Sequence, residues 1–492
     1  MSSTSSTAQD AARAGLWSGL DLLVRQGLQF AVTVILARLL TPQEFGTVAL
    51  LAVFTGLWTV LIEGGANTAL LRTPSSTRVQ ESSVFWMNVG AGAACALLLL
   101  LIAPLVARFY SIPLLVPLMG AAAVQVIFVS LGSIHVALLT RALRFNRLVL
   151  VGLCSTILSG SVAVFLALSG YGVWALAAQA VVGAGVSSAV LWRVSRWRPA
   201  WTFSFSEARS LFRFGSHVII SGTLDVLYTQ GFALLIGKMY GVRDVGLYAR
   251  AQNTQALPTA VIAGIIGRVT LPVLANRVDN RDGLRRAVSA STRLAMAIAL
   301  PVAVGLSSLS EVAVALLYGP AWAPAAPILA ILAIAASFYP HAIIVQYGIL
   351  AQDRSRAYLN LIVAKLSFAL VTMIVGSFFG IMGLAYSQIV SGVVGTLMNA
   401  DAARRHVGYG FGEQARDLAG VIAISGAMGL CLAWLTAATD YPPLVDAAVF
   451  VPAGAAIYAL LAMLFRVRPV LEAFDLGRSM LPGVFARLAR RG

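Results

Sequence analysis

The feature that most constrains this chain is a series of apolar runs, each about 20 residues long, separated by short polar segments. A helix rises about 1.5 Å per residue and the hydrocarbon core of a membrane is about 30 Å thick, so each run predicts one membrane-spanning helix. The runs are 16–36, 47–66, 84–106, 117–138, 148–168, 172–191, 214–236, 245–271, 288–307, 324–346, 358–378, 382–398, 418–437 and 445–465. The sequence therefore predicts an all-α integral membrane protein with about 14 transmembrane helices.

Composition excludes the soluble classes of protein. Hydrophobic residues make up 59% of the chain and charged residues 11%, whereas soluble domains carry roughly 25% charged residues. A soluble enzyme, a nucleic-acid binder or a disordered scaffold of this length needs more polar surface. The net charge of +16 therefore does not indicate a nucleic-acid partner, and its meaning has to come from where the basic residues lie.

Basic residues alternate between the two sides of the predicted bundle. If the N-terminus lies inside, most of the 35 lysines and arginines fall in cytoplasmic segments and in the C-terminal tail. The outer loops hold Arg38, Arg108, Lys238 and Arg243. Cytoplasmic loops of membrane proteins are enriched in Lys and Arg, so we expect an even number of spans with both termini in the cytoplasm. The prolines of the eighth and tenth runs, Pro258, Pro327 and Pro340, predict kinks.

No metal, cofactor or nucleotide is expected. The cysteines Cys95, Cys154 and Cys431 all fall inside apolar runs, which argues against a disulfide framework. The chain has no Cys-x-x-Cys spacing, no His-Glu-x-x-His and no phosphate-binding loop of the Gly-x-x-x-x-Gly-Lys-Ser/Thr type. Direct use of ATP is therefore not expected.

A short pattern recurs at a spacing of 200 residues. Residues 37–46 read ARLLTPQEFG and residues 237–246 read GKMYGVRDVG, which share a base, five residues, an acid, one residue and Gly. A weaker echo joins Phe109-Tyr110 to Leu317-Tyr318. Both copies lie on the same predicted side of the membrane, so the repeat is parallel. It predicts two pseudo-symmetric lobes of six helices that face each other, with two extra C-terminal helices.

The repeat suggests four segments. We expect an N-terminal six-helix lobe (1–194), a cytoplasmic amphipathic linker (195–213), a C-terminal six-helix lobe (214–403), and helices 13 and 14 with a basic cytoplasmic tail (404–492). The linker mixes tryptophans with arginines, and Ser204 and Glu207 have the spacing of a capping box, which favours an interfacial helix. A plain tether between the lobes fits the same residues.

Several stretches resemble one transporter family, the polysaccharide transporters or Wzx-like lipid-linked oligosaccharide flippases. They are LARLLTPQEFGTVAL, VFWMNVGAGAA, VGLYARAQNTQALP, and the region from RVTLPVLANRVDNRDGLRRA through ALLYGPAWAPAAPILAILAIA. The family belongs to the MOP (multidrug/oligosaccharidyl-lipid/polysaccharide) superfamily, with the lipid II flippases and the MATE drug exporters. The resemblance covers the first twelve runs and implies two lobes around a central cavity that work by alternating access. Phe232 stands where relatives often carry an acid, so the role of that acid is in doubt.

The resemblance implies a flippase rather than an enzyme. Its cargo would be a polyprenyl-diphosphate-linked oligosaccharide repeat unit, moved from the inner to the outer leaflet of the cell inner membrane for an exopolysaccharide, capsule or O-antigen. The implied partners are this glycan, membrane lipids, a polysaccharide polymerase and a chain-length regulator. One alternative is a MATE-like small-molecule exporter, which predicts acids in the cavity, and another is a membrane-embedded glycan polymerase or ligase, which predicts a sizeable catalytic loop.

Polar residues inside the apolar runs are the candidates for substrate contact. A charge at the bilayer centre costs about 2.5–3.5 kcal/mol, so each needs a partner or a function. The substrate-binding candidates are Arg25, Gln29, Arg250, Gln252, Asn253 and Gln388. Arginine suits a diphosphate because its charge is permanent and its hydrogen bonds are bidentate. Arg250 and Asn253 are expected on one helix face, and snorkelling of Arg250 to the outer headgroups is the alternative.

The gating and coupling candidates are Asp21, Asp225, Glu63 and Lys365. Adding 200 to the number of Arg25 gives Asp225, so the lobes would place opposite charges at equivalent depth, where they could pair in one state and separate in the other. A local ion pair between Asp21 and Arg25 is the simpler alternative. Glu63 is either a titrating carboxylate or a structural acid near the interface. The last two runs either form an apolar groove for the polyprenyl tail or only face lipid.

Overall fold

The computed structural model describes residues 26–64, 67, 70, 76–275, 277, 280–352, 354–439 and 441–472; the side chains of some residues inside helices, Glu63 among them, lie outside this description. Every regular element in these ranges is helical. The elements are the first helix Gln26–Leu39, α2 (Pro42–Gly64), α4 (Arg78–Tyr110), α5 (Leu115–Arg141), α6 (Phe145–Leu168), α7 (Val173–Ser195), α8 (Phe205–Met239), α9 (Val242–Ala275), α10 (Arg281–Ser308), α11 (Ser310–Leu317), the 3-10 helix η1 (Pro320–Trp322), α12 (Ala325–Ala336), α13 (Phe338–Leu350), α14 (Ser355–Ser377), α15 (Gly380–His406), α16 (Phe411–Ala438) and α17 (Pro443–Leu464).

Eleven stretches of helix within the described ranges are long and apolar enough to cross a membrane, with α12 and α13 counted together. The helices α8 and α9, with 35 and 34 residues, contain the seventh and eighth predicted runs and extend beyond them at both ends. The prediction of an all-α integral membrane protein is confirmed. The count of 14 spans stays a prediction, since the first run begins among residues outside the description.

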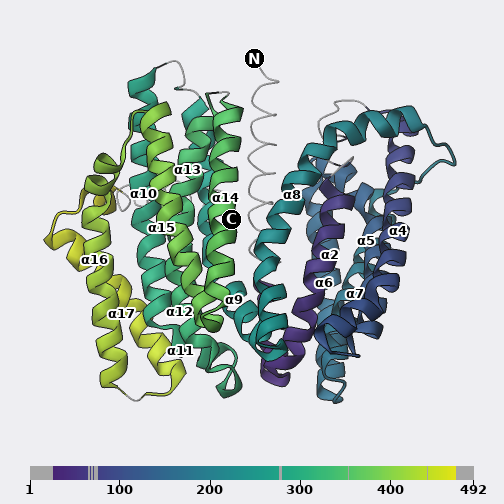
Figure 1. Cartoon of the computed structure of the whole chain (residues 1–492), viewed down its shortest axis with the longest axis horizontal. Helices are drawn as coiled ribbons and strands as arrows, with labels where there is room; N and C mark the ends of the chain where they lie inside the picture. Colours follow the sequence, from purple (N-terminus) through teal and green to yellow (C-terminus); the bar gives the residue numbers. More distant parts are fainter. Residues whose placement is uncertain are drawn as a thin grey trace, which may run out of the picture. The chain divides into compact units, whose positions relative to one another are not determined.

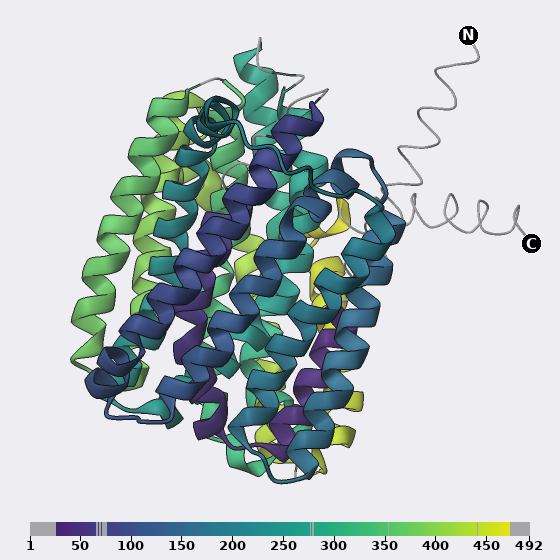
Figure 2. The ribbon, with the colours of Figure 1, turned by 90° about the vertical axis from the view of Figure 1, so that its right-hand side faces the viewer.

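The chain divides into two compact units, Met1–Gly246 and Leu247–Gly492. In the first unit, α4 packs on α5, α5 and α6 pack on α7, and α2 packs on α8, as the long neighbouring ribbons in Figures 1 and 2 show. In the second unit, α10 packs on α16 and α14 on α15. The boundary lies in the first turns of α9, and the four segments expected from the sequence stay a prediction.

Two glycines that are 200 residues apart meet within the first unit. A Cβ added to Gly46 would lie 1.7 Å from the carbonyl oxygen of Val242, and one added to Gly246 would lie 1.9 Å from that of Pro42. The first turns of α2 and α9 therefore cross with their backbones in contact, which only glycine allows at both positions. This contact gives the repeated glycine of the sequence pattern a structural reason.

One predicted kink is a break in the helix. The tenth predicted run is split at Ser337 into two helices, α12 and α13. Pro340 follows this break by three residues, and a proline both lacks an amide hydrogen and clashes with the carbonyl four residues before it. Pro327 lies in the first turn of α12, where proline is tolerated. α9 continues as one helix past Pro258.

The predicted capping box of the linker is wrong. Ser204 is the residue before α8, but its side chain makes no capping hydrogen bond. The carboxylate of Glu207 instead accepts a hydrogen bond of 2.9 Å from Nε2 of Gln80 at the start of α4. Residues 196–204 are not helical, and from Phe205 onward the chain continues without a break into the seventh predicted run.

Candidate functional site

The start of α9 holds the densest set of polar residues that the sequence singled out. Leu247, Tyr248, Arg250, Ala251 and Thr254 are all buried, at spacings that place them along one side of the helix. The guanidinium of Arg250 therefore points into the second unit. Snorkelling of this side chain to the lipid headgroups does not describe this conformation, since the residue is 6% exposed.

Two aromatic rings receive the Arg250 guanidinium. Its Cζ lies 5.5 Å from the ring centroid of Tyr318 and 5.7 Å from that of Trp322. The two rings lie 5.9 Å apart and are themselves buried. A cation within about 6 Å of an aromatic centroid is attracted by the ring, by about 0.5–2 kcal/mol depending on desolvation. The buried charge is thus stabilised by aromatic faces.

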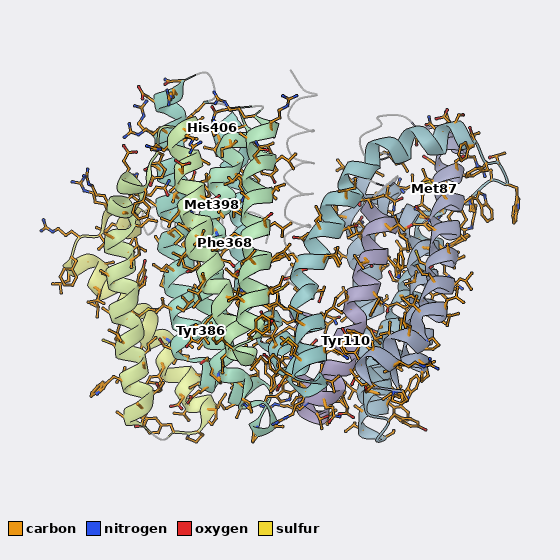
Figure 3. The ribbon with its side chains drawn as sticks, viewed as in Figure 1. Met87, Tyr110, Phe368, Tyr386, Met398 and His406 are labelled. Atoms are coloured by element: carbon orange, nitrogen blue, oxygen red, sulfur yellow. The ribbon has the colours of Figure 1, made fainter. Side chains whose placement is uncertain are left out.

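Two hydrogen bonds tie the same side of α9 to neighbouring segments. The hydroxyl groups of Thr254 and Tyr318 are 2.7 Å apart, and Nε2 of Gln388 on α15 donates to the hydroxyl of Tyr248 over 2.6 Å. Tyr386, labelled in Figure 3, is exposed two residues before Gln388 on the same helix. The candidate Gln388 therefore contacts α9 at Tyr248, two residues before Arg250.

The other side of α9 is more open. Asn253 is exposed and Gln252 is half-buried, so Arg250 and Asn253, three residues apart on α9, differ in burial. Nε2 of Gln255 donates 2.8 Å to the hydroxyl of Thr259. Both residues line a cavity of about 20 Å³ between α9, α10 and α12, which is room for about one water molecule.

The first-unit candidates are only partly described. Gln29 is exposed on the first helix and Asp225 is exposed on α8. Arg25 and Asp21, and the side chain of Glu63, lie outside the described residues. The pairing of Arg25 with Asp225, and that of Asp21 with Arg25, therefore stay predictions.

Lys365 and His341 lie in the second unit, on α14 and α13. Lys365 is half-buried, and a Cβ on Gly395 of α15 would come within 3.3 Å of its Cε, so the small residue leaves room for the lysine stem. Nε2 of His341 lies 2.8 Å from the side-chain oxygen of Gln414, and both residues are buried. This hydrogen bond agrees with a core histidine rather than a proton relay.

The sequence alone does not reveal the aromatic partners of Arg250. One of them, Tyr318, belongs to the echo of Phe109-Tyr110 at Leu317-Tyr318, and both tyrosines of this echo form a hydrogen bond with a residue of a neighbouring helix. The hydroxyl of Tyr110, labelled in Figure 3, donates 3.3 Å to the carbonyl of Leu234 in the first unit. In the second unit, the hydroxyl of Tyr318 forms a hydrogen bond with that of Thr254. Within the described ranges, no group of three or more His, Cys, Asp or Glu residues is placed to hold a metal ion.

Comparison with known proteins agrees with this fold. Residues 35–327 match the sequence profile of the family described as "Polysaccharide biosynthesis protein". The "Succinoglycan biosynthesis transport protein ExoT" of Rhizobium meliloti (strain 1021) is 30% identical over 318 residues, which cover 65% of this chain and 64% of ExoT. The "Teichuronic acid biosynthesis protein TuaB" of Bacillus subtilis (strain 168) is 25% identical over 65% of this chain and 66% of TuaB. The matched region thus spans just under two thirds of each relative.

A solved structure extends the likeness to most of the chain. The "Lipid II flippase MurJ, inward closed conformation" superposes with a TM-score of 0.75 over 92% of this chain and 98% of MurJ, at 15% sequence identity. At this identity the match shows a shared fold.

Proposed function

The chain belongs to the polysaccharide biosynthesis protein family, and from this premise we propose that it is a transporter of lipid-linked glycan. Its cargo is a polyprenyl-diphosphate-linked oligosaccharide repeat unit, which it moves from the inner to the outer leaflet by alternating access for export of a surface polysaccharide. The observation that carries the proposal is the family match over residues 35–327, together with the similarity to ExoT, which is named as a biosynthesis transport protein.

The proposal includes a location and partners. The protein spans the cell inner membrane with both termini in the cytoplasm, in agreement with the distribution of its basic residues. It receives its glycan from the inner leaflet and delivers it to a polymerase and a chain-length regulator outside. The two six-helix lobes (1–194 and 214–403) enclose the path of the glycan, and 195–213 and 404–492 join and extend them.

Arg250 is the residue we propose for contact with the diphosphate. In the described conformation it lies against Tyr318 and Trp322, an attraction of about 0.5–2 kcal/mol. Charge-assisted, bidentate hydrogen bonds to a phosphate are about twice as strong as neutral ones, so a diphosphate that reaches Arg250 would offer the guanidinium stronger contacts than the rings do. The aromatic pair would hold the guanidinium while no substrate is bound and release it when the diphosphate arrives.

The other candidates take weaker roles. Gln29, Gln252, Asn253 and Gln388 would make loose contacts to sugar hydroxyls, since a tight site would hinder release. Arg25 would meet the diphosphate from the inner side. Asp21, Asp225, Glu63 and Lys365 would couple or gate the movement.

A deletion strain tests the function. We expect lipid-linked repeat units to accumulate on the inner leaflet and the surface polymer to be lost, and a plasmid copy of the wild-type gene to restore both. Arg250→Ala should fail to restore export at a membrane abundance equal to wild type, whereas Tyr386→Phe, at an exposed position of α15, should restore it. Normal surface polymer without such accumulation would remove the flippase proposal, and loss of tolerance to a cationic drug instead would favour an exporter.

A further inference from the structure

A second polar site lies far along the chain from Arg250, where α10 and α16 begin in the second unit. These helices run in the same direction: Arg285 contacts Glu413, and one turn later the hydroxyl of Ser289 donates 2.7 Å to Asp417. Beside them is a cavity of about 680 Å³, within the usual range for a site that binds a small molecule. We name it the α10–α16 cavity.

The walls of the α10–α16 cavity are positively charged. They include five arginines, Arg277, Arg285, Arg286, Arg293 and Arg416, and three carboxylates, Asp282, Glu413 and Asp417. Two of the arginines are held by acids: Arg285 pairs with Glu413, and Arg293 lies 3.5 Å from Asp417 and 3.9 Å from Glu472. The ion pairs with Glu413 and Asp417 link α10 to α16 at the wall of the cavity.

The acid at its base is satisfied by further groups. The carboxylate of Asp417 accepts hydrogen bonds from Ser289 over 2.7 Å and from the hydroxyl of Tyr409 over 2.8 Å. The charge of Asp417 is compensated by Arg293, which lies 3.5 Å away. Asp282 lies in the first turn of α10, where the helix dipole favours an acid.

Three arginines are left over. Arg277, Arg286 and Arg416 are exposed, and the part of the chain that the structure describes gives them no ion pair and no hydrogen bond. They come from three places: the segment before α10, α10 itself and α16. With five arginines and three carboxylates, the lining carries a net positive charge that attracts an anion, and the fork geometry of guanidinium groups matches phosphate oxygens.

The level of the cavity along the helix indicates the source of that anion. α10 has 28 residues, which rise about 42 Å, whereas the hydrocarbon core needs about 30 Å. Its apolar part lies toward Ser308, so the first two turns, with Arg285 and Arg286, project beyond the hydrocarbon into the headgroup layer. Lipid phosphates lie at this level.

We propose that the α10–α16 cavity binds the phosphate-bearing headgroup of an anionic membrane lipid, with Arg277, Arg286 and Arg416 as its contacts. A zwitterionic headgroup fits less well, because its ammonium group would enter a cavity already lined with arginines. The same phosphate chemistry is offered by an anionic phospholipid and by a polyprenyl diphosphate. The site does not depend on the transport proposal, since it is built from residues apart from Arg250.

Native mass spectrometry of the purified full chain in detergent tests this site. The probes are cardiolipin, a polyprenyl diphosphate and phosphatidylethanolamine. We expect Arg286→Ala/Arg416→Ala to weaken binding of an anionic probe by roughly tenfold or more, since each basic residue near an anionic lipid headgroup adds to the affinity. Arg286→Lys/Arg416→Lys should fall between, because it keeps the charge and loses the bidentate contact.

Arg404→Ala/Arg405→Ala is the matched control. These arginines end α15 on the same side of the second unit, but both pair with Asp401 and neither lines the cavity, so binding should stay at the wild-type level. Equal binding by wild type and Arg286→Ala/Arg416→Ala, or equal binding of cardiolipin and phosphatidylethanolamine, would overturn the proposal.

The same titrations identify the lipid. Loss of cardiolipin binding alone in Arg286→Ala/Arg416→Ala assigns the cavity to a bilayer phospholipid, and loss of polyprenyl diphosphate binding alone assigns it to the carrier lipid. Both results support the site. Binding of free pyrophosphate with the same affinity as the lipids would contradict it, because a headgroup site also gains affinity from the lipid chains.

Discussion

The two units differ in what covers the first turns of one long helix, α4 in the first unit and α10 in the second. Both helices begin with a run of polar residues. The segment after α7 lies over the start of α4 as an extended strap, residues 196–204. The amides of Ala200 and Ser204 donate to the hydroxyls of Ser82 and Ser83, each over 2.9 Å, and Nε1 of Trp86 donates to the carbonyl of Ala200. The segment after α15 instead turns at Tyr409 into α16, which packs along α10.

The charges at these two ends follow the same division. In the first unit, Glu81 is 8% exposed and accepts hydrogen bonds from Nη2 of Arg141 over 2.8 Å and from Nε1 of Trp197 over 2.7 Å. In the second, the pair of Arg285 with Glu413 is exposed and opens onto the α10–α16 cavity. A sealed polar cluster holds a fold together, whereas an open one with spare arginines is available to a ligand.

The largest effect that sharpens this comparison is expected from Glu81→Ala. The variant leaves Arg141 mostly buried without its acid, which costs about 3–5 kcal/mol. Glu413→Ala breaks the exposed pair of the second unit and should cost about 0–1 kcal/mol. Thermal unfolding in detergent, followed by the loss of monodisperse protein, measures both, and equal losses would break the comparison.

A smaller effect is expected from the strap. Trp197→Phe keeps the ring but removes the indole donor to Glu81, which should cost about 1.5–3 kcal/mol because the acceptor is charged. Trp201→Phe changes a neighbouring tryptophan that is 90% exposed and should stay within about 0.5 kcal/mol. If the two variants unfold at the same temperature, the strap does not hold the first unit closed.

The second unit should respond to alkaline pH through Tyr409. Burial, and then the hydrogen bond to Asp417, raises the pKa of this phenol above its ordinary value. Its contribution to stability is complete below the unfolded pKa of about 10 and is lost as pH rises through the folded pKa. Tyr409→Phe should be less stable than wild type at neutral pH and should lose less stability above pH 10 or so. An unchanged alkaline slope, measured as unfolding temperature against pH, would show that ionisation of Tyr409 does not contribute to the loss of stability at alkaline pH.

The smallest effect is expected at the end of α15. Arg404 and Arg405 form exposed ion pairs with Asp401. His406, the next residue along the chain, is labelled in Figure 3. Exposed ion pairs contribute little to stability, so Arg404→Ala/Arg405→Ala should leave the unfolding temperature unchanged. A marked shift would mean that this end of the second unit is held by charge after all.

Helix positions could be predicted well because the membrane demands apolar length. The run 148–168 corresponds to α6 (Phe145–Leu168), and 445–465 to α17 (Pro443–Leu464). The prediction fell short where a helix continues past the hydrocarbon: the run 288–307 belongs to α10, which begins at Arg281. Charged residues interrupt an apolar run without interrupting a helix.

The candidate site could be predicted only in part. Arg250 stands out in the sequence. The aromatic residues that contact it, Tyr318 and Trp322, lie about 70 residues away, and no sequence spacing links them to it. Residues three apart on a helix differ by about 60° in direction, which is enough to place Arg250 inside and Asn253 outside. The three spare arginines of the α10–α16 cavity appeared in the sequence only as a topology signal.

Reconstitution tests the central claim most directly. The purified chain is placed in vesicles that carry a labelled polyprenyl-diphosphate-linked oligosaccharide in the inner leaflet, and an added glycosidase digests whatever reaches the outside. We predict that wild-type protein exposes the glycan to digestion and that Arg250→Ala at equal density does not. Vesicles in which the wild-type protein leaves the glycan as protected as in protein-free vesicles would contradict the account.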